Sequence, residues 1–198
     1  MRHWPFDAGD AVAIRGAEGV LCDLLDVPEK VLDALRRVDR AVDDVRAALA
    51  EALDVATYGS LNRFGMYSRG VIDVPQCDAS CMIGQEMFER FELPSLAHEV
   101  AGLSASIYHL DGPGAIRHLE AICSLEKLDM IQWVPGAGQD DKDWSDLRRR
   151  IDELGKGQIY QAGANLGASE IKTVWEIFSS RKLYFQVSAD VHDELTAE

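Results

Sequence analysis

SIYHLDGP, residues 106–113, is the stretch that decides the fold. It is an apolar strand pattern that delivers His109 and Asp111 to a Gly-Pro turn, and a helical pattern opens directly after the turn. A related stretch, DMIQWVPG, follows about 24 residues later at residues 129–136. Function in α/β proteins tends to lie where a strand passes into the next helix. The sequence therefore predicts two successive strands whose polar or aromatic ends point the same way.

Short apolar runs alternate with helical patterns from residue 71 onward. The predicted strands are Val71–Gln76, Ser104–His109, Met130–Val134, Gln158–Gln161 and Leu183–Val187. The predicted helices are Gln85–Ala101, Gly114–Ser124, Lys142–Leu154 and Ala168–Ser179. Strand centres lie about 24 to 34 residues apart, which is the size of a strand-plus-helix unit. This spacing predicts a βα array with parallel strands.

The chain before residue 71 is mainly helical in pattern. Apolar residues recur at three- and four-residue steps over Pro28–Leu53, and a proline suits a first helical turn, so a long helix is predicted there. Gly16–Leu25 predicts a shorter helix, and Ala11–Ile14 predicts the end of a strand. Tyr58–Gly70 has no clear period and is long for a structureless connection, which indicates a functional loop.

The period of the pattern alone does not separate a closed barrel from an open, doubly wound sheet. No Gly-x-Gly-x-x-Gly follows a strand, which speaks against a dinucleotide-binding sheet. A complete (β/α)₈ barrel takes about 250 residues and eight strands, whereas this chain has 198 residues and five clear strand patterns. We therefore expect one α/β domain over residues 1–198, a partial (β/α)₈ barrel that lacks its first βα units or is completed by assembly.

Composition narrows the class of partner. The chain is 47% hydrophobic and 27% charged, with a formal net charge of −14, so it repels nucleic acids and anionic membrane surfaces. No run approaches the roughly 18 apolar residues of a membrane span, and residues 1–20 contain no apolar signal core. Four scattered cysteines are typical of free thiols. We expect a cytoplasmic protein that binds neither nucleic acid nor membrane.

Three side chains are the candidate catalytic residues. Asp78 follows the predicted strand that ends at Gln76, where a carboxylate can move a proton or hold a cationic group; alternatively it caps the next helix. His109 and Asp111 are two residues apart on a strand and point to one side, which favours a proton-transfer pair. The alternative is that Asp111 braces the turn and His109 is an interior histidine.

Other strand ends supply candidate substrate contacts. Gln132 and Trp133 would suit a flat or heterocyclic substrate, although a tryptophan at this place is often part of the core. Ser188 is a polar candidate after the last predicted strand. His109 is also a candidate metal ligand together with a thiol, although a zinc site needs three or four converging ligands.

Four stretches together resemble the uroporphyrinogen decarboxylase family, and more closely its branch related to cobalamin-dependent methyltransferases. They are QCD at residues 76–78, MFERFELP at 87–94, YHLDGPG at 108–114 and IQWVPG at 131–136. The resemblance runs from about residue 20 to the end of the chain. It implies a (β/α)₈ barrel that acts on a small methylated or carboxylated substrate at the carboxyl ends of its strands.

The resemblance implies two chemistries. Decarboxylases of the family, which are lyases, hold tetrapyrrole carboxylates and protonate a pyrrole ring, while its methyltransferases use zinc to activate a thiol that takes methyl from a corrinoid. Zinc and a corrinoid protein are therefore the implied cofactor and partner. This chain keeps the histidine of the methyltransferases' His-x-Cys-Gly motif as His109 but has Asp111 in place of the cysteine. A further cysteine ligand is absent from residues 183–190, and a His/Asp metal site stays open.

The decarboxylase pattern is also only partly matched. Its essential aspartate comes from an early strand that this chain does not contain, and its serine stands where Asp78 is found here. Three interpretations remain: an enzyme with His109, Asp111 and Asp78 at the mouth, a catalytically silent binding module that oligomerises to complete its fold, and a metal-dependent hydrolase-like barrel. Uncovered strand edges favour a homo-oligomer in the second case.

Overall fold

The computed structural model describes residues 15–139, 142–160, 167–180, 182–187, 190 and 192. Its α-helices are α2 (Ala17–Asp26), α3 (Pro28–Ala52), α4 (Val55–Tyr58), α5 (Gln85–Met87), α6 (Leu93–Ala101), α7 (Leu119–Cys123), α8 (Ser145–Glu153) and α9 (Ala168–Ile177). Three other helical turns are η1 (Asp78–Met82), η2 (Phe88–Glu92) and η3 (Pro113–His118). The strands are β1 (Ser60–Leu61), β2 (Tyr67–Ser68), β3 (Ile72–Asp73), β4 (Ala105–Asp111), β5 (Met130–Val134), β6 (Gly157–Tyr160) and β7 (Leu183–Phe185). The strand expected over Ala11–Ile14 lies outside the described residues.

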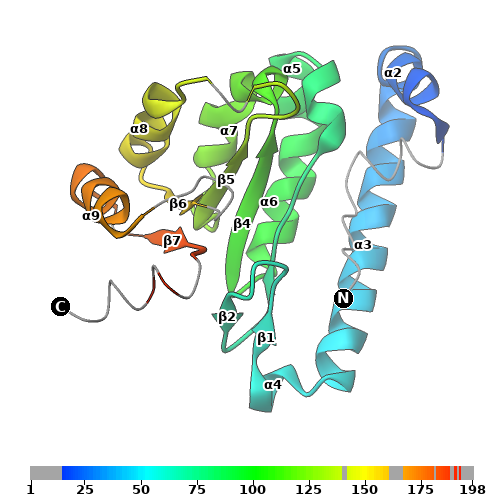
Figure 1. Ribbon diagram of the computed structural model, residues 1–198. Helices are drawn as coiled ribbons and strands as arrows, with labels where there is room; N and C mark the ends of the chain where they lie inside the picture. The colour runs from blue at the N-terminus through cyan, green and yellow to red at the C-terminus, as the bar shows by residue number, and fades with distance from the viewer. Residues whose placement is uncertain are drawn as a thin grey trace.

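A curled parallel sheet organises the described residues (Figure 1). Its order is β3-β4-β5-β6-β7, and every neighbouring pair is parallel. Strand order follows chain order throughout, so the described sheet lacks the reversal that defines a doubly wound fold. The expected parallel βα array is confirmed, and the fold is a mixed α/β structure whose sheet curls as part of a barrel wall does.

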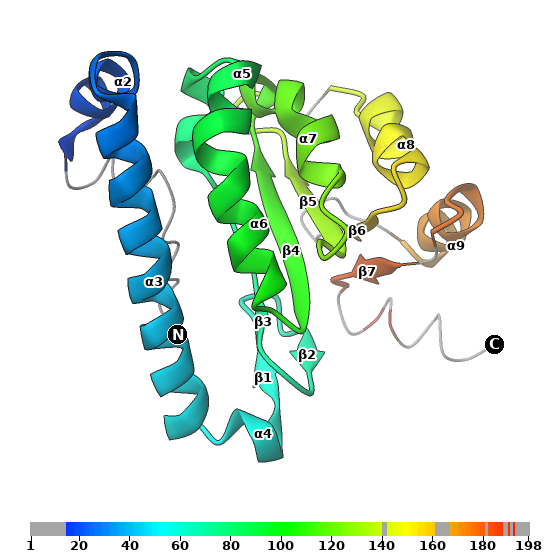
Figure 2. The ribbon, with the colours of Figure 1, turned by 180° about the vertical axis from the view of Figure 1, so that it is seen from behind.

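Helices cover one face of this sheet. Figure 2 shows α6 and α7 in front of β4 and β5. Side chains alternate across a strand, so Tyr108 and Leu110 of β4 enter the main core under the helices, where they join Phe88, Leu96 and Ile122. Burial of this apolar surface is the main stabilising contribution to the domain.

The opposite, concave face carries a smaller core. Ile107 and Met130 lie there beside Ile159, and the side chain of Phe64 packs against this cluster. Phe64 belongs to the turn between β1 and β2, which pair as an antiparallel hairpin within the stretch expected to be a functional loop. The Tyr184 hydroxyl of β7 donates a hydrogen bond to the Phe64 carbonyl at 2.7 Å. The hairpin is thereby fixed over the concave face.

Two predicted helices are interrupted, for a physical reason. Gln85–Ala101 divides into α5, the π-helical turn η2 and α6, and Pro94, which has no N–H to continue the backbone ladder, stands at the start of α6 directly after the π-helical turn. Gly114–Ser124 begins as the 3₁₀ turn η3 before α7. None of the described helices is long and apolar enough to cross a bilayer.

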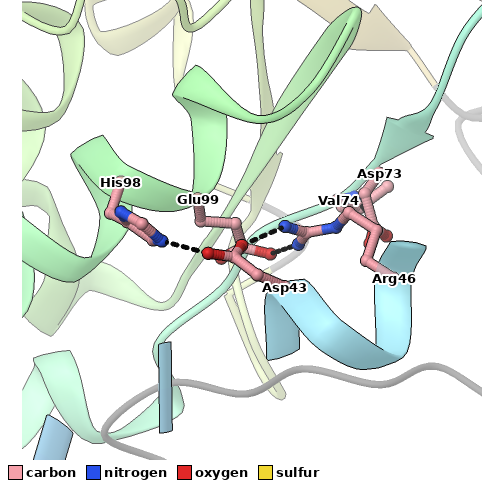
Figure 3. Close-up of polar contacts among 6 residues, drawn as sticks. All are labelled: Asp43, Arg46, Asp73, Val74, His98 and Glu99. Carbon is pink, nitrogen blue, oxygen red and sulfur yellow. Dashed lines mark hydrogen bonds and ion pairs between the residues drawn. The ribbon is translucent and has the colours of Figure 1, made fainter. Parts of the chain in front are cut away.

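The long helix α3 confirms the prediction over Pro28–Leu53, yet only Leu35 and Val42 of its side chains are buried. It is attached to α6 mainly through polar groups, which Figure 3 shows in close-up. Arg46 of α3 donates to Glu99 of α6 at 3.0 Å, and each side chain is 14% exposed. One turn earlier, His98 Nε2 lies 2.7 Å from Asp43 Oδ2. Ion pairs and hydrogen bonds therefore hold this helix where apolar packing is sparse.

We expect Arg46→Ala to lower the free energy of unfolding by about 1 to 3 kcal/mol, because it leaves a shielded carboxylate without its charged partner. The matched control is Arg90→Ala, since Arg90 pairs with Glu29 at the same distance of 3.0 Å but on the exposed surface. That control should change stability by about 1 kcal/mol or less. Urea denaturation of both variants is the measurement, and equal effects would contradict a special role for the Arg46 pair.

Candidate functional site

Three polar side chains form a row across the concave face near the carboxyl ends of the strands. Gln76 bridges to His109 of β4, and His109 pairs in register with Gln132 of β5. Residues in register on parallel strands share a face and lie about 4.8 Å apart. Each of the three polar residues comes two positions after an apolar residue that packs on the same face. These apolar residues are Val74, Ile107 and Met130. The concave face therefore turns from apolar to polar toward its mouth.

A short hydrogen bond fixes the imidazole of His109. Its Nδ1 lies 2.7 Å from Oε1 of Gln132, whose side chain is only 4% exposed. Arg63 also donates to this oxygen, so the oxygen acts as an acceptor and Nδ1 of His109 carries the proton. In the neutral ring, Nε2 is then the atom that can accept a proton.

Arg63 is the residue that the sequence analysis missed. It stands in the turn of the β1–β2 hairpin, and its guanidinium donates to Gln76 Oε1 at 3.0 Å and to Gln132 Oε1 at 3.3 Å. Burial lowers the pKa of Arg63, while the charges of Asp73 and Asp78 act in the opposite direction. No carboxylate lies within ion-pair distance of this guanidinium in the part of the chain described here. It is a half-buried cation held by neutral amides.

A turn motif positions Arg63. The side-chain oxygen of Asn62 accepts hydrogen bonds from the backbone N–H groups of Phe64 and Met66, each at 3.0 Å. Gly65 completes the turn with a φ of +75°, in the region that favours glycine. The Asn-Arg-Phe-Gly sequence is thus a turn signal of the kind that could have identified a hairpin here.

Asp78 and Asp111 lie at the exposed rim of the site. Asp78 accepts a hydrogen bond from Gln76 Nε2 at 3.3 Å, and it makes no side-chain cap to η1. No hydrogen bond joins Asp111 to His109 among the described atoms, and the ring nitrogen Nδ1 of His109 bonds Gln132. The turn after β4 is closed by the backbone, through a bond from the Gly112 N–H to the Val134 carbonyl at 2.8 Å. The structure thus shows His109 paired with an amide and Asp111 free to contact a ligand.

The structure separates Gln132 from the other proposed substrate contacts. Trp133 follows Gln132 on β5, so its side chain enters the main core on the opposite face. There it packs edge-on against Trp144, with ring centroids 4.9 Å apart. Ser188 lies outside the described residues.

No group of three or more His, Cys, Asp or Glu side chains that could hold a metal ion occurs in the described residues. His109 therefore has no set of converging partners of that kind there. None of the four cysteines, all of which lie in the described residues, forms a disulfide bond, and Cys77 is buried beside the site while Cys81 is exposed.

His118 supports the site from behind. Its ring is fully buried, stacks on Phe88 at a centroid distance of 4.2 Å, and places Nε2 2.9 Å from the Ser80 carbonyl in η1. Gly114 lets the η3 backbone approach η1 closely, since a Cβ there would meet the Cys81 Cβ at 3.0 Å. These contacts hold η1, and with it Asp78, against the end of the sheet.

No family model, no curated protein and no solved structure matches this chain.

Burial lowers the pKa of His118 below its ordinary value of 6.5. The His118 imidazole therefore binds a proton less readily in the folded protein than in the unfolded chain. Stability is therefore complete above about pH 6.5 and falls as the pH is lowered through that value, by up to about 1.4 kcal/mol per pH unit. We expect His118→Gln to be less stable at pH 8 but to depend less on pH between 7 and 5. Denaturant midpoints across this range are the measurement, and an unchanged slope would show that His118 titrates normally.

Proposed function

We propose that the cluster of Arg63, Gln76, His109 and Gln132 binds a small substrate through a carboxylate and that the protein is a decarboxylase of the uroporphyrinogen decarboxylase type. The observation that carries the proposal is the guanidinium of Arg63, half-buried among neutral amides and joined to His109 through the shared oxygen of Gln132. The curled parallel sheet, with this cluster at its carboxyl edge, is the support that the fold gives.

The charge balance of the cluster favours an anion. A guanidinium has five N–H donors, and Arg63 uses two of them on amide oxygens among the described residues. Removing a cation from water is costly unless an opposite charge compensates it, and the carboxylates of Asp73 and Asp78 act on Arg63 without forming an ion pair with it in the described residues. A carboxylate matches the planar fork of an arginine, so it is the ligand that best completes this site.

The arrangement also suits proton delivery to carbon. In decarboxylation the bond to the carboxylate carbon breaks, CO₂ leaves, and the electron pair stays on the substrate carbon, which then takes a proton. Protonated His109 can supply that proton from Nε2 because Gln132 fixes the other ring nitrogen. Asp78 and Asp111, both exposed at the rim, are placed to hold an N–H or cationic group of the substrate.

Arg63 is assigned to an anchoring carboxylate rather than to the departing one. A salt bridge to the departing group would stabilise the bound substrate more than a transition state in which that charge is being lost. The proposed substrate therefore carries at least two carboxylates. Methyl transfer from a corrinoid partner with zinc stays a prediction of the family resemblance alone.

We expect Arg63→Gln to weaken binding of a polycarboxylate by about tenfold or more, since the variant keeps hydrogen bonding but loses the charge. Titration calorimetry with uroporphyrinogen, and separately with succinate as a small dicarboxylate, is the measurement. Arg69→Gln is the matched control, because Arg69 is an exposed arginine close to the same hairpin. Equal affinities of the two variants would remove Arg63 from the site.

We expect His109→Ala and Asp111→Asn to abolish turnover while leaving the thermal melt nearly unchanged. Loss of the proton donor in His109→Ala should cost a factor of about 10² to 10⁴ in rate, while Asp111→Asn removes the charge proposed to hold an N–H or cationic group of the substrate. Release of CO₂ from uroporphyrinogen by the unaltered protein and the two variants is the measurement. Binding without CO₂ release by the unaltered protein would favour the silent binding module, and an active His109→Ala variant would refute the role of the imidazole.

A further inference from the structure

Helix α3 carries a second apolar stripe that is exposed from Ala34 onward except for the half-buried Val38, while Val31 at its start packs against the main core. Figures 1 and 2 show α3 at the margin of the molecule, with α6 on its inner side. The stripe repeats every seven residues in two rows, which are Val31, Val38, Val45 and Ala52 in one and Ala34, Ala41 and Ala48 in the other. Val45 is 42% exposed, and Leu49 beside it is 45% exposed. Alternating steps of three and four residues are the seam pattern of a coiled coil.

Apart from Val31, the stripe lies beside the buried contacts of α3 and is distinct from them. Leu35 and Val42 face the domain and are almost fully buried. The three alanines of the second row are exposed. Small side chains at alternate layers allow two helices to approach closely and interlock. The part of α3 from residue 34 to its end at Ala52 offers a seam about 28 Å long.

Four charged residues flank this seam at the same heptad position, also seven residues apart. They are Lys30 and Arg37 in the first half of α3 and Asp44 and Glu51 in the second half. None of the four makes an ion pair with another residue in the described part of the chain. The sign of the charge therefore changes once, at the middle of the helix.

This charge pattern is complementary to itself when one helix is reversed. In an antiparallel pairing, the two-fold axis crosses the seam at the height of residues 40 and 41 along the helix. This pairing places Lys30 beside Glu51 of the partner subunit and Arg37 beside Asp44 of the partner subunit. In a parallel pairing these positions would instead face the partner's row of Leu35 and Val42, which the partner's own domain buries. The pattern thus selects a second copy of this chain, in the antiparallel direction.

We propose that the protein is a homodimer joined by an antiparallel coiled coil between the α3 helices of two copies. The seam consists of the two apolar rows, and four ion pairs across the two-fold axis set its direction and register. The inference is independent of the proposed carboxylate site, because α3 contributes none of its residues.

Sedimentation equilibrium of the full chain tests the dimer, with an expected mass of twice 21.9 kDa. Lys30→Glu/Arg37→Glu and, separately, Asp44→Lys/Glu51→Lys should each weaken self-association at least about tenfold, because every pair then becomes repulsive. An equimolar mixture of the two double variants should restore the dimer as a heterodimer. The matched control is Arg36→Glu/Arg40→Glu, which makes the same charge change on the same helix away from the seam and should leave the dimer intact.

Val45→Glu tests the apolar seam and should give a folded monomer, since Val45 is exposed in the single chain, with a melt that no longer depends on protein concentration. A monomer for the unaltered protein at high micromolar concentration would overturn the proposal. A dimer that persists in both double variants would also overturn the proposal, because its interface would then lie elsewhere. Double variants that dissociate but do not form a heterodimer on mixing would exclude the antiparallel register.

Discussion

The alternation of side chains along β4 and β5 is the constraint on which the other features of this structure depend. One set of positions sends Tyr108 and Leu110 into the core beneath the helices, while the intervening set sends Ile107 and His109 to the concave face. A shift of one residue in register would exchange the two sets and bury the imidazole in the main core. Packing of the helices therefore also determines where the polar row lies.

Within that row, the amide of Gln132 does the positioning. Its oxygen accepts hydrogen bonds from Arg63 of the hairpin and from His109 of the neighbouring strand. One buried acceptor therefore orients both the proposed anion-binding group and the proposed proton-transfer group. An amide suits this place because it stays neutral at every physiological pH. A carboxylate there would neutralise the guanidinium that the proposed substrate requires.

Local patterns in the sequence predicted the strands and helices closely, since period-two and period-3.6 repeats are local properties of the chain. The same patterns located Asp78, His109 and Gln132 at strand ends. They missed Arg63 because its contact with Gln132 spans 69 residues. The predicted pairing of His109 with Asp111 neglected a closer neighbour: residues two apart on a strand are about 6.6 Å apart, whereas in-register neighbours are about 4.8 Å apart. Trp133 beside Gln132 could have been excluded by alternation alone.

The hydrogen bond from Tyr184 to the Phe64 carbonyl has a consequence for the order in which the molecule is built. The two residues are 120 positions apart in the chain, and the hairpin settles on a face made by strands that follow it in sequence. Closing so long a loop is entropically costly until the intervening strands are paired. Because contacts this distant in sequence form late in small domains, we expect Arg63 to reach Gln132 only after β4 and β5 have paired.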